Sequence, residues 1–200
     1  MCAAAAFGAT AQDFTHDFEY EGIYYDILSE TEVAVADAPF EAPYSGDVVI
    51  PSQVSHDGST YTVTEIGDYA FSGSGVTSVS MPNTVKTIDK YAFYLCYGLT
   101  NVEMSSQIEY IGYMAFGSCG ITSIRLPNTL MSIGEEAFSK SQLESIEIPA
   151  SVEVIGNMAF AHTVNMSVIN VDAENKKYCS IDGVLYDKAV TKLIACPAKK

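Results

Sequence analysis

The chain has 200 residues, 48% of them hydrophobic, and a formal net charge of −15 at pH 7. That apolar content is enough for a sizeable core, and it excludes an intrinsically disordered acidic chain. Lys86 is the first Lys or Arg of the chain, so the N-terminal part would repel nucleic acids and anionic lipid surfaces. We therefore expect no nucleic-acid partner.

Residues 1–11, MCAAAAFGATA, resemble the end of a secretory leader. Their run of small apolar residues closes with Ala9-Thr10-Ala11, which is an A-x-A cleavage pattern. The basic segment that opens such leaders is missing, so the leader is either truncated or a chance likeness. We expect a secreted or cell-surface protein. We expect no membrane insertion, because no apolar stretch is long enough to span a bilayer.

Residues 12–47 are predicted to form an N-terminal β cap. Aromatic and β-branched residues on both sides of Glu21-Gly22 predict a hairpin over residues 18–28, and a further strand is expected near residues 33–35. Such a segment would cover the apolar surface and the unpaired strand edge of the first repeat.

Residues 48–171 repeat one pattern. It begins with the strand residues Val48-Val49-Ile50. An excursion with a turn at Asp57-Gly58 comes next. Ala-Phe pairs then recur every 22 or 23 residues, which is a period typical of leucine-rich repeats. We number the repeats 1 to 5 by these pairs. In order, the pairs are Ala70-Phe71, Ala92-Phe93, Ala115-Phe116, Ala137-Phe138 and Ala159-Phe160.

Each repeat combines two apolar segments with a turn. In repeat 5, Leu143, Ile146 and Ile148 follow the pattern LxxIxI, in which the last two residues alternate as in a short half-buried strand. A second apolar pair follows at Val152 and Ile155, so the chain turns twice towards one core. A Gly or Asp then precedes a predicted short helical turn that carries Ala and Phe inward. Because Gly and Asp replace each other at this position, we infer a requirement of the backbone rather than of the side chain. The Gly or Asp positions are Gly67, Asp89, Gly112, Gly134 and Gly156.

The recurring IPxxVxxIGxxAF resembles the BspA-like bacterial leucine-rich-repeat family, whose repeats read roughly LxxIxIPxxVxxIGxxAFxxC. Departures in residues 48–165 are few, with Asp89 in place of the Gly and Ser105 in place of the Pro. The resemblance implies a leucine-rich-repeat solenoid, a β-rich α/β fold in which the repeats wind into a right-handed superhelix. Short parallel strands, short helical turns and β-hairpin caps are its expected elements. The resemblance also implies a secreted or cell-surface protein of anaerobic bacteria. Some proteins of this family bind host proteins or other cells.

Residues 172–200 are predicted to form a C-terminal β-hairpin segment. SIDGVLYDKAVTKLIACP indicates two strands joined near residues 187–190. It resembles a YxSxDGVLYxKxxTxLIxxP hairpin that the family carries within or after its arrays, where further repeats commonly follow. We expect either a fragment of a longer protein or a short protein that uses the hairpin as a lid.

Exposed strand positions supply the candidate binding surface. Equivalent residues of adjacent repeats stack about 5 Å apart, so columns of side chains face a partner. Glu103, Arg125 and Glu147 predict neighbouring opposite charges, which are either an ordinary feature of a sheet surface or part of a binding site. Their small and charged character suits a flat contact with a macromolecule better than a small substrate. The candidate surface comprises Ser78, Ser80, Asn101, Glu103, Ser123, Arg125, Ser145 and Glu147.

Tyrosines gathered in repeats 2 and 3 give an alternative aromatic patch. A Tyr ring has an apolar face and a polar tip, which suits an interface. Packing between the repeats is the competing interpretation. The patch comprises Tyr91, Tyr94, Tyr110 and Tyr113.

The cysteines fall into two pairs. Cys96 and Cys119 both lie three residues after a repeat Phe, where the family often has Cys as a small buried filler. A disulfide or a metal site is the alternative. Cys179 and Cys196 flank the C-terminal hairpin and form a disulfide if its register places them opposite each other.

No catalytic residue, metal ligand or cofactor is predicted. The three histidines lack metal-ligand spacing, and the known nucleophile, zinc, phosphate-loop and dinucleotide motifs are absent. We predict a non-enzymatic protein for protein–protein interaction or adhesion, whose partner is a host matrix protein, another cell surface or a glycan. The alternatives are a passive spacer or stalk of a larger envelope protein, and an enzyme with an unrecognised site.

Overall fold

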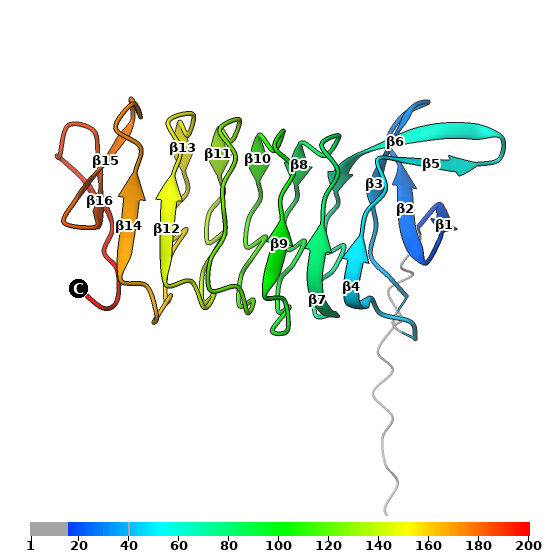
Figure 1. Cartoon of the computed structure of the whole chain (residues 1–200), viewed down its shortest axis with the longest axis horizontal. Helices are drawn as coiled ribbons and strands as arrows, with labels where there is room; N and C mark the ends of the chain where they lie inside the picture. Colours follow the sequence, from blue (N-terminus) through cyan, green and yellow to red (C-terminus); the bar gives the residue numbers. More distant parts are fainter. Residues whose placement is uncertain (1–15, 40) are drawn as a thin grey trace, which may run out of the picture.

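The computed structural model describes residues 16–39 and 41–200, so the leader-like segment at residues 1–11 lies outside the described residues. The chain winds into an elongated stack in which each repeat lies beside the next (Figure 1). Parallel strand pairs join neighbouring repeats. The predicted repeat solenoid is therefore confirmed in its overall architecture.

Two columns of short strands run along the stack. The first column is one continuous sheet, and the second is divided into two sheets because residues 121–126 form no strand. The first column contains β6 (Ser59–Ile66), β8 (Thr87–Ile88), β10 (Tyr110–Ile111), β11 (Ser132–Ile133) and β13 (Val154–Ile155). The second contains β4 (Ser45–Val49), β7 (Gly75–Ser80) and β9 (Asn101–Glu103), then β12 (Ser145–Ile148) and β14 (Val168–Val171).

The N-terminal β cap extends the first column. It contains β1 (Phe18–Tyr20), β2 (Ile23–Ile27) and β3 (Glu32–Val35), and β5 (Gln53–His56), in the excursion that follows, pairs with β6. Glu21 and Gly22 both have positive φ, 51° and 80°, as the two central residues of a type I′ hairpin turn do. Asp57 and Gly58 repeat this geometry between β5 and β6. Both predicted hairpin turns and the strand near residues 33–35 are confirmed.

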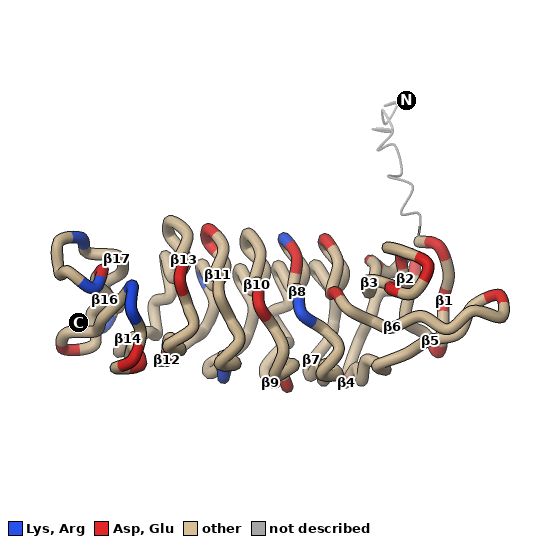
Figure 2. The backbone as a smooth tube through the Cα atoms, turned by 90° about the horizontal axis from the view of Figure 1, so that it is seen from above, with Lys and Arg blue, Asp and Glu red and all other residues tan. Residues whose placement is uncertain are grey.

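The C-terminal segment has one strand more than the sequence predicted. Three antiparallel strands follow β14, namely β15 (Tyr178–Ile181), β16 (Val184–Asp187) and β17 (Leu193–Ala195). The expected connection after Asp187 joins β16 and β17, and Asp182-Gly183 turns the chain between β15 and β16. Lys and Arg gather at this end of the stack, whereas Asp and Glu are dense at the N-terminal end (Figure 2).

The Ala-Phe segments form a third column, which is built from turns. The expected short helical turns are not found, since none of residues 16–39 and 41–200 is helical. The residue before each Ala has a φ between 48° and 60°, which a right-handed helix does not allow. These residues are Tyr69, Tyr91, Met114, Glu136 and Met158.

Hydrogen bonds between repeats hold this turn column together. In repeat 4, Ala137 N–H donates back to Gly134 C=O at 3.3 Å, closing a β-turn whose third residue has positive φ, as in type II. Alternate N–H groups instead donate to the next repeat, and Phe138 N–H lies 2.8 Å from Ala159 C=O. Repeats 1 to 4 all share this arrangement, so the turn column is a continuous ladder. Its three bonds from repeat 4 are Glu136 to Asn157, Phe138 to Ala159 and Lys140 to Ala161.

The Gly before the turn in repeats 1, 3, 4 and 5 is explained by the close approach of the neighbouring backbone, whereas repeat 2 has Asp89 at this position. Gly134 does not have a left-handed φ, but a Cβ added there would lie 2.6 Å from the carbonyl carbon of Gly112. Adjacent repeats thus approach backbone to backbone at this position. The backbone requirement inferred from the sequence is a requirement for close packing rather than for an unusual φ.

Phenyl rings form the axis of the core. Phe71, Phe93, Phe116, Phe138 and Phe160 are all buried, and neighbouring ring centroids lie 5.1 to 5.8 Å apart at interplanar angles of 2° to 10°. The predicted contacts between successive Phe rings are confirmed. At the N-terminal end the Tyr44 ring lies 4.7 Å from the Phe71 ring and so closes the column. Among the described residues, no helix is long and apolar enough to cross a membrane.

Candidate functional site

The second strand column carries the predicted binding surface. Within β7 and β9, Ser78 faces Asn101 and Ser80 faces Glu103 across the parallel pair. Direct side-chain bonds join both pairs, because Asn101 Nδ2 donates to Ser78 Oγ and Ser80 Oγ donates to Glu103 Oε2, each at 2.9 Å. Each pair is thus joined by one hydrogen bond along the exposed face.

The strand ladder is interrupted at repeat 4. Residues 121–126 keep the inward packing of their apolar side chains, since Ile121 is 0% exposed and Leu126 6%. They form no strand with β9 or β12. Contact with the following repeat is kept at the start of the segment, where Glu144 N–H donates to Thr122 C=O at 2.9 Å. The backbone thus separates from its neighbours at the repeat that carries Arg125.

A polar groove of about 540 Å³ lies at this interruption. Four of the eight predicted surface residues line it, and they alternate along two neighbouring segments. The predicted four are Ser123, Arg125, Ser145 and Glu147. Sequence reasoning missed two further polar lining residues, Asn128 and Asp172. The surface expected to be flat is hollowed here, and nothing in the repeat pattern of residues 121–126 marks it.

Arg125 is exposed in this groove and free to meet a partner. Within the described part of the chain, the ion pairs closer than 4.0 Å join other residues, so neither Glu103 nor Glu147 holds the guanidinium. The neighbouring opposite charges predicted from the sequence lie on one face without forming direct pairs. An Arg side chain presents a planar fork of donors for carboxylates and carbonyl groups.

The alternative aromatic patch belongs to the turn column and to β10, apart from the strand-face groove. Tyr91 is its centre, because its ring lies 5.3 Å from the Tyr94 ring and 5.1 Å from the Tyr113 ring, both edge-on. The Tyr69 ring stacks on Tyr91 from repeat 1 at 4.7 Å. Tyr110 is 40% exposed in β10. Tyr91, Tyr94 and Tyr113 thus pack partly between repeats and remain half-exposed.

The four cysteines in the described part of the chain, Cys96, Cys119, Cys179 and Cys196, have free thiols. Cys96 and Cys119 are buried, and each Sγ donates to a Phe carbonyl at 2.9 Å, that of Phe71 and that of Phe116. Burial raises the pKa of Cys96 to about 11 and the pKa of Cys119 to about 12. In the hairpin register, Cys179 lies opposite Tyr186 rather than opposite Cys196.

Comparison with known proteins gives a consistent result. The family described as BspA type Leucine rich repeat region matches residues 64–181 in six copies. No curated protein matches the sequence.

Residues 16–39 and 41–200 contain no cluster of three or more His, Cys, Asp or Glu side chains suited to a metal ion.

Solved structures show the same likeness. The chain is similar to a leucine-rich repeat protein from Bacteroides ovatus, at 32% identity and a TM-score of 0.69 over 77% of this chain and 41% of that chain. It is similar to the T. pallidum leucine-rich repeat protein TpLRR, at 26% identity and a TM-score of 0.67 over 76% of this chain and 70% of that chain. The pneumococcal vaccine antigen PcpA shares the fold, at 24% identity and a TM-score of 0.67 over 91% of this chain and 56% of that chain. The chain thus spans less than two thirds of the Bacteroides ovatus and PcpA structures.

Proposed function

Because the chain belongs to the BspA-type leucine-rich-repeat family, we propose that it is an exported or cell-surface binding module without catalytic activity. Its partner is a protein of a host matrix or of another cell surface, and the contact is made by the strand face around Arg125. The observation that supports this proposal most directly is the polar groove of about 540 Å³ with an exposed Arg125 that forms no ion pair with any described residue.

The chemistry of the groove favours a macromolecule. Ser123, Asn128 and Ser145 offer hydroxyl and amide groups, and Arg125 lines the same groove as the acceptors Glu147 and Asp172. Small-molecule sites are usually enclosed and largely apolar with few polar groups. A shallow polar groove on a repeat surface instead suits a protein segment with complementary carbonyl and carboxylate groups, and Arg is enriched in such interfaces.

Arg125→Glu tests the proposal. We expect this variant to lose binding in a screen against matrix proteins, bacterial and host cell surfaces and glycans, because it replaces the donor with a carboxylate. Its free energy of unfolding should stay within about 0.5 kcal/mol of the parent protein, as surface changes usually do. Lys140→Glu, an equal charge change on the turn column, is the matched control and should bind normally.

Four results would decide against this proposal. Equal loss in Lys140→Glu would indicate a general charge effect. Retained binding by Arg125→Glu together with loss in Tyr110→Ala and Tyr113→Ala would place the contact on the aromatic patch. No binding to any surface would favour a spacer or stalk, and turnover of a substrate would favour an enzyme.

A further inference from the structure

The turn column of repeats 1 to 3 carries a group of tyrosine rings, Tyr69, Tyr91 and Tyr113, which we call the tyrosine cluster. The Tyr91 ring lies 4.7 Å from the Tyr69 ring at an interplanar angle of 17°, and 5.1 Å from the Tyr113 ring at 88°. Tyr69 is 43% exposed, and Tyr91 and Tyr113 are half-exposed. Rings from three adjacent repeats thus meet at the surface.

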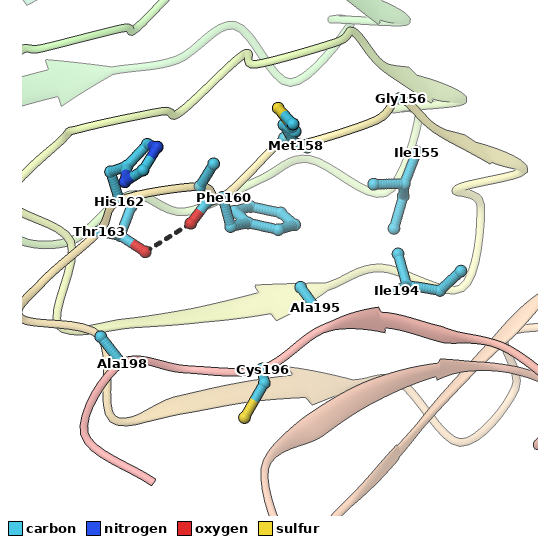
Figure 3. Close-up of a pocket in the computed structure, with 12 residues that line it drawn as sticks. Ile155, Gly156, Met158, Phe160, His162, Thr163, Ile194, Ala195, Cys196 and Ala198 are labelled. Carbon is cyan, nitrogen blue, oxygen red and sulfur yellow. Dashed lines mark hydrogen bonds between the residues drawn. The ribbon is translucent and has the colours of Figure 1, made fainter.

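The repeat does not require tyrosine at these positions. Tyr69 and Tyr91 hold the position before the Ala, which is held in repeats 3 to 5 by Met114, Glu136 and Met158. Tyr113 holds the preceding position, which is held in the other repeats by Asp68, Lys90, Glu135 and Asn157. Figure 3 shows the turn of repeat 5 beside a cavity of about 270 Å³, and Met158 is 65% exposed there whereas Phe160 is buried. Since both positions accept charged or flexible side chains in the same fold, packing between repeats does not account for the rings.

Acidic side chains accompany the cluster. Between the Gly or Asp position and the Ala, the turns of repeats 1 to 4 contain a single basic residue and the four acidic residues Asp68, Asp89, Glu135 and Glu136. The basic residue, Lys90, is bound to Asp68 at 2.8 Å. The other three carboxylates form no ion pair closer than 4.0 Å with any described residue. The acidic turn of repeat 4 adjoins that of Tyr113, because Met114 N–H donates to Glu135 C=O at 3.1 Å.

We propose that the tyrosine cluster binds a basic, arginine-containing segment of another protein. A guanidinium group stacks its planar face on a tyrosine ring, whose electron-rich face attracts the positive charge. Its N–H groups donate to a neighbouring carboxylate at the same time. Adjacent repeats stack about 5 Å apart, and alternate residues of an extended segment lie about 7 Å apart, so successive arginines meet successive repeats. This surface is separate from the groove around Arg125, so the two can hold different partners.

Three other occupants fit less well. Nucleic acids and anionic lipid surfaces are repelled by the acidic turns. A neutral glycan also stacks on aromatic rings, but it gains little from carboxylates that lack a cation. A second copy of this chain offers one arginine, Arg125, and its other basic residues are lysines. A lysine ammonium is compact and strongly hydrated, and it lacks the planar face that stacks on a ring.

A peptide titration followed by ¹⁵N–¹H NMR of the full chain tests the proposal. The probe is the synthetic peptide acetyl-SRSRSRS-amide. We expect it to shift the amide signals of Tyr69, Tyr91 and Tyr113, and to bind more weakly as the salt concentration rises. The same peptide with citrulline in place of arginine keeps the side-chain shape but loses the charge, so it should bind about tenfold more weakly or worse. A lysine peptide should fall between the two.

Tyr91→Met provides the matching change in the protein. Methionine holds this position in repeats 3 and 5, so the fold should be kept, while the arginine peptide should bind about fivefold more weakly or worse. Glu135→Gln should also weaken binding, because it removes an unpaired carboxylate. The controls are Tyr97→Met, at a 72% exposed ring outside the cluster, and Glu174→Gln, at an 82% exposed side chain. Both should bind the peptide normally.

Several outcomes would overturn the proposal. Equal binding of the arginine and citrulline peptides would show that no cation is recognised. Unchanged binding by both Tyr91→Met and Glu135→Gln, or an equal loss in the two controls, would show that the cluster is not the site. Shifts confined to residues 121–126 would assign the peptide to the groove around Arg125. Shifts of the cluster with the neutral glycan maltohexaose but not with the peptide would assign it to a glycan, and self-association that Tyr91→Met abolishes in sedimentation would assign it to a second copy.

Discussion

The phenyl rings of Phe116 and Phe138 lie parallel, with centroids 5.4 Å apart and planes inclined by 2°, and both side chains are fully buried. Each ring thus fills the space between two repeats. Phe138→Ala should destabilise the protein by about 3 to 5 kcal/mol, because it removes a buried ring and leaves a cavity. Denaturant unfolding measures the change. Tyr97→Ala, at a 72% exposed ring, is the control, and equal stability of the two variants would contradict the assigned core.

Gly134→Ala tests the close approach of repeats 3 and 4. The added Cβ would lie 2.6 Å from the carbonyl carbon and 2.7 Å from the carbonyl oxygen of Gly112, so the backbones must separate. We expect a loss of about 1 to 3 kcal/mol, the usual cost of overpacking. Gly98→Ala is the control, because its Cβ would meet Val76 O at 3.4 Å. A melting temperature of Gly134→Ala equal to that of the control would refute the packing explanation.

Cys96 and Cys119 should remain unreactive in the native protein. Burial raises their pKa values to about 11 and about 12, so almost no thiolate is present at pH 8 and alkylating reagents cannot reach it. Iodoacetamide at that pH should modify the exposed Cys196 and spare both. Mass spectrometry after digestion reads out the sites. A Cys96–Cys119 crosslinked peptide in most unreduced molecules would show that the filler interpretation is wrong.

Acidic residues beside repeat 1 should make stability depend on pH. Burial and the neighbouring Asp89 raise the pKa of Glu65, and burial and the neighbouring Asp68 raise the pKa of Asp89. The folded protein therefore binds more protons than the unfolded chain, and its stability falls as pH rises above 4.5 and 3.8, the ordinary pKa values of Glu and Asp. Asp89→Asn should raise the melting temperature at pH 7, with the gain vanishing below about pH 3, where both carboxyls are protonated in either state.

A control separates this effect from net charge. Asp57→Asn removes one charge from a side chain that is 89% exposed and should leave the melting curve unchanged across the same pH range. A lower melting temperature of Asp89→Asn than of the parent at pH 7 would contradict the assigned destabilisation.

Much of the fold could be predicted from the sequence because the repeat is local and recurrent. The spacing of Ala-Phe pairs fixed the repeat length, and the alternation in each strand identified residues such as Ile146 and Ile148 as core. The pairs Glu21-Gly22 and Asp57-Gly58 marked hairpins because both central residues of such turns need positive φ. These features depend on residues close together in the chain, so a pattern of a few positions carries them.

Only the tertiary structure decided the features that arise between repeats. The residue before each Ala has positive φ, and in repeats 1 to 4 alternate N–H groups donate to carbonyls of the next repeat, an arrangement that excludes a helix that satisfies its own bonds. The interruption of the strand ladder at residues 121–126 has no counterpart in the sequence pattern, so the groove around Arg125 could not be predicted. Local sequence therefore determined which residues face the core, whereas packing between repeats determined the conformation of the turns and the place where the strand ladder is broken.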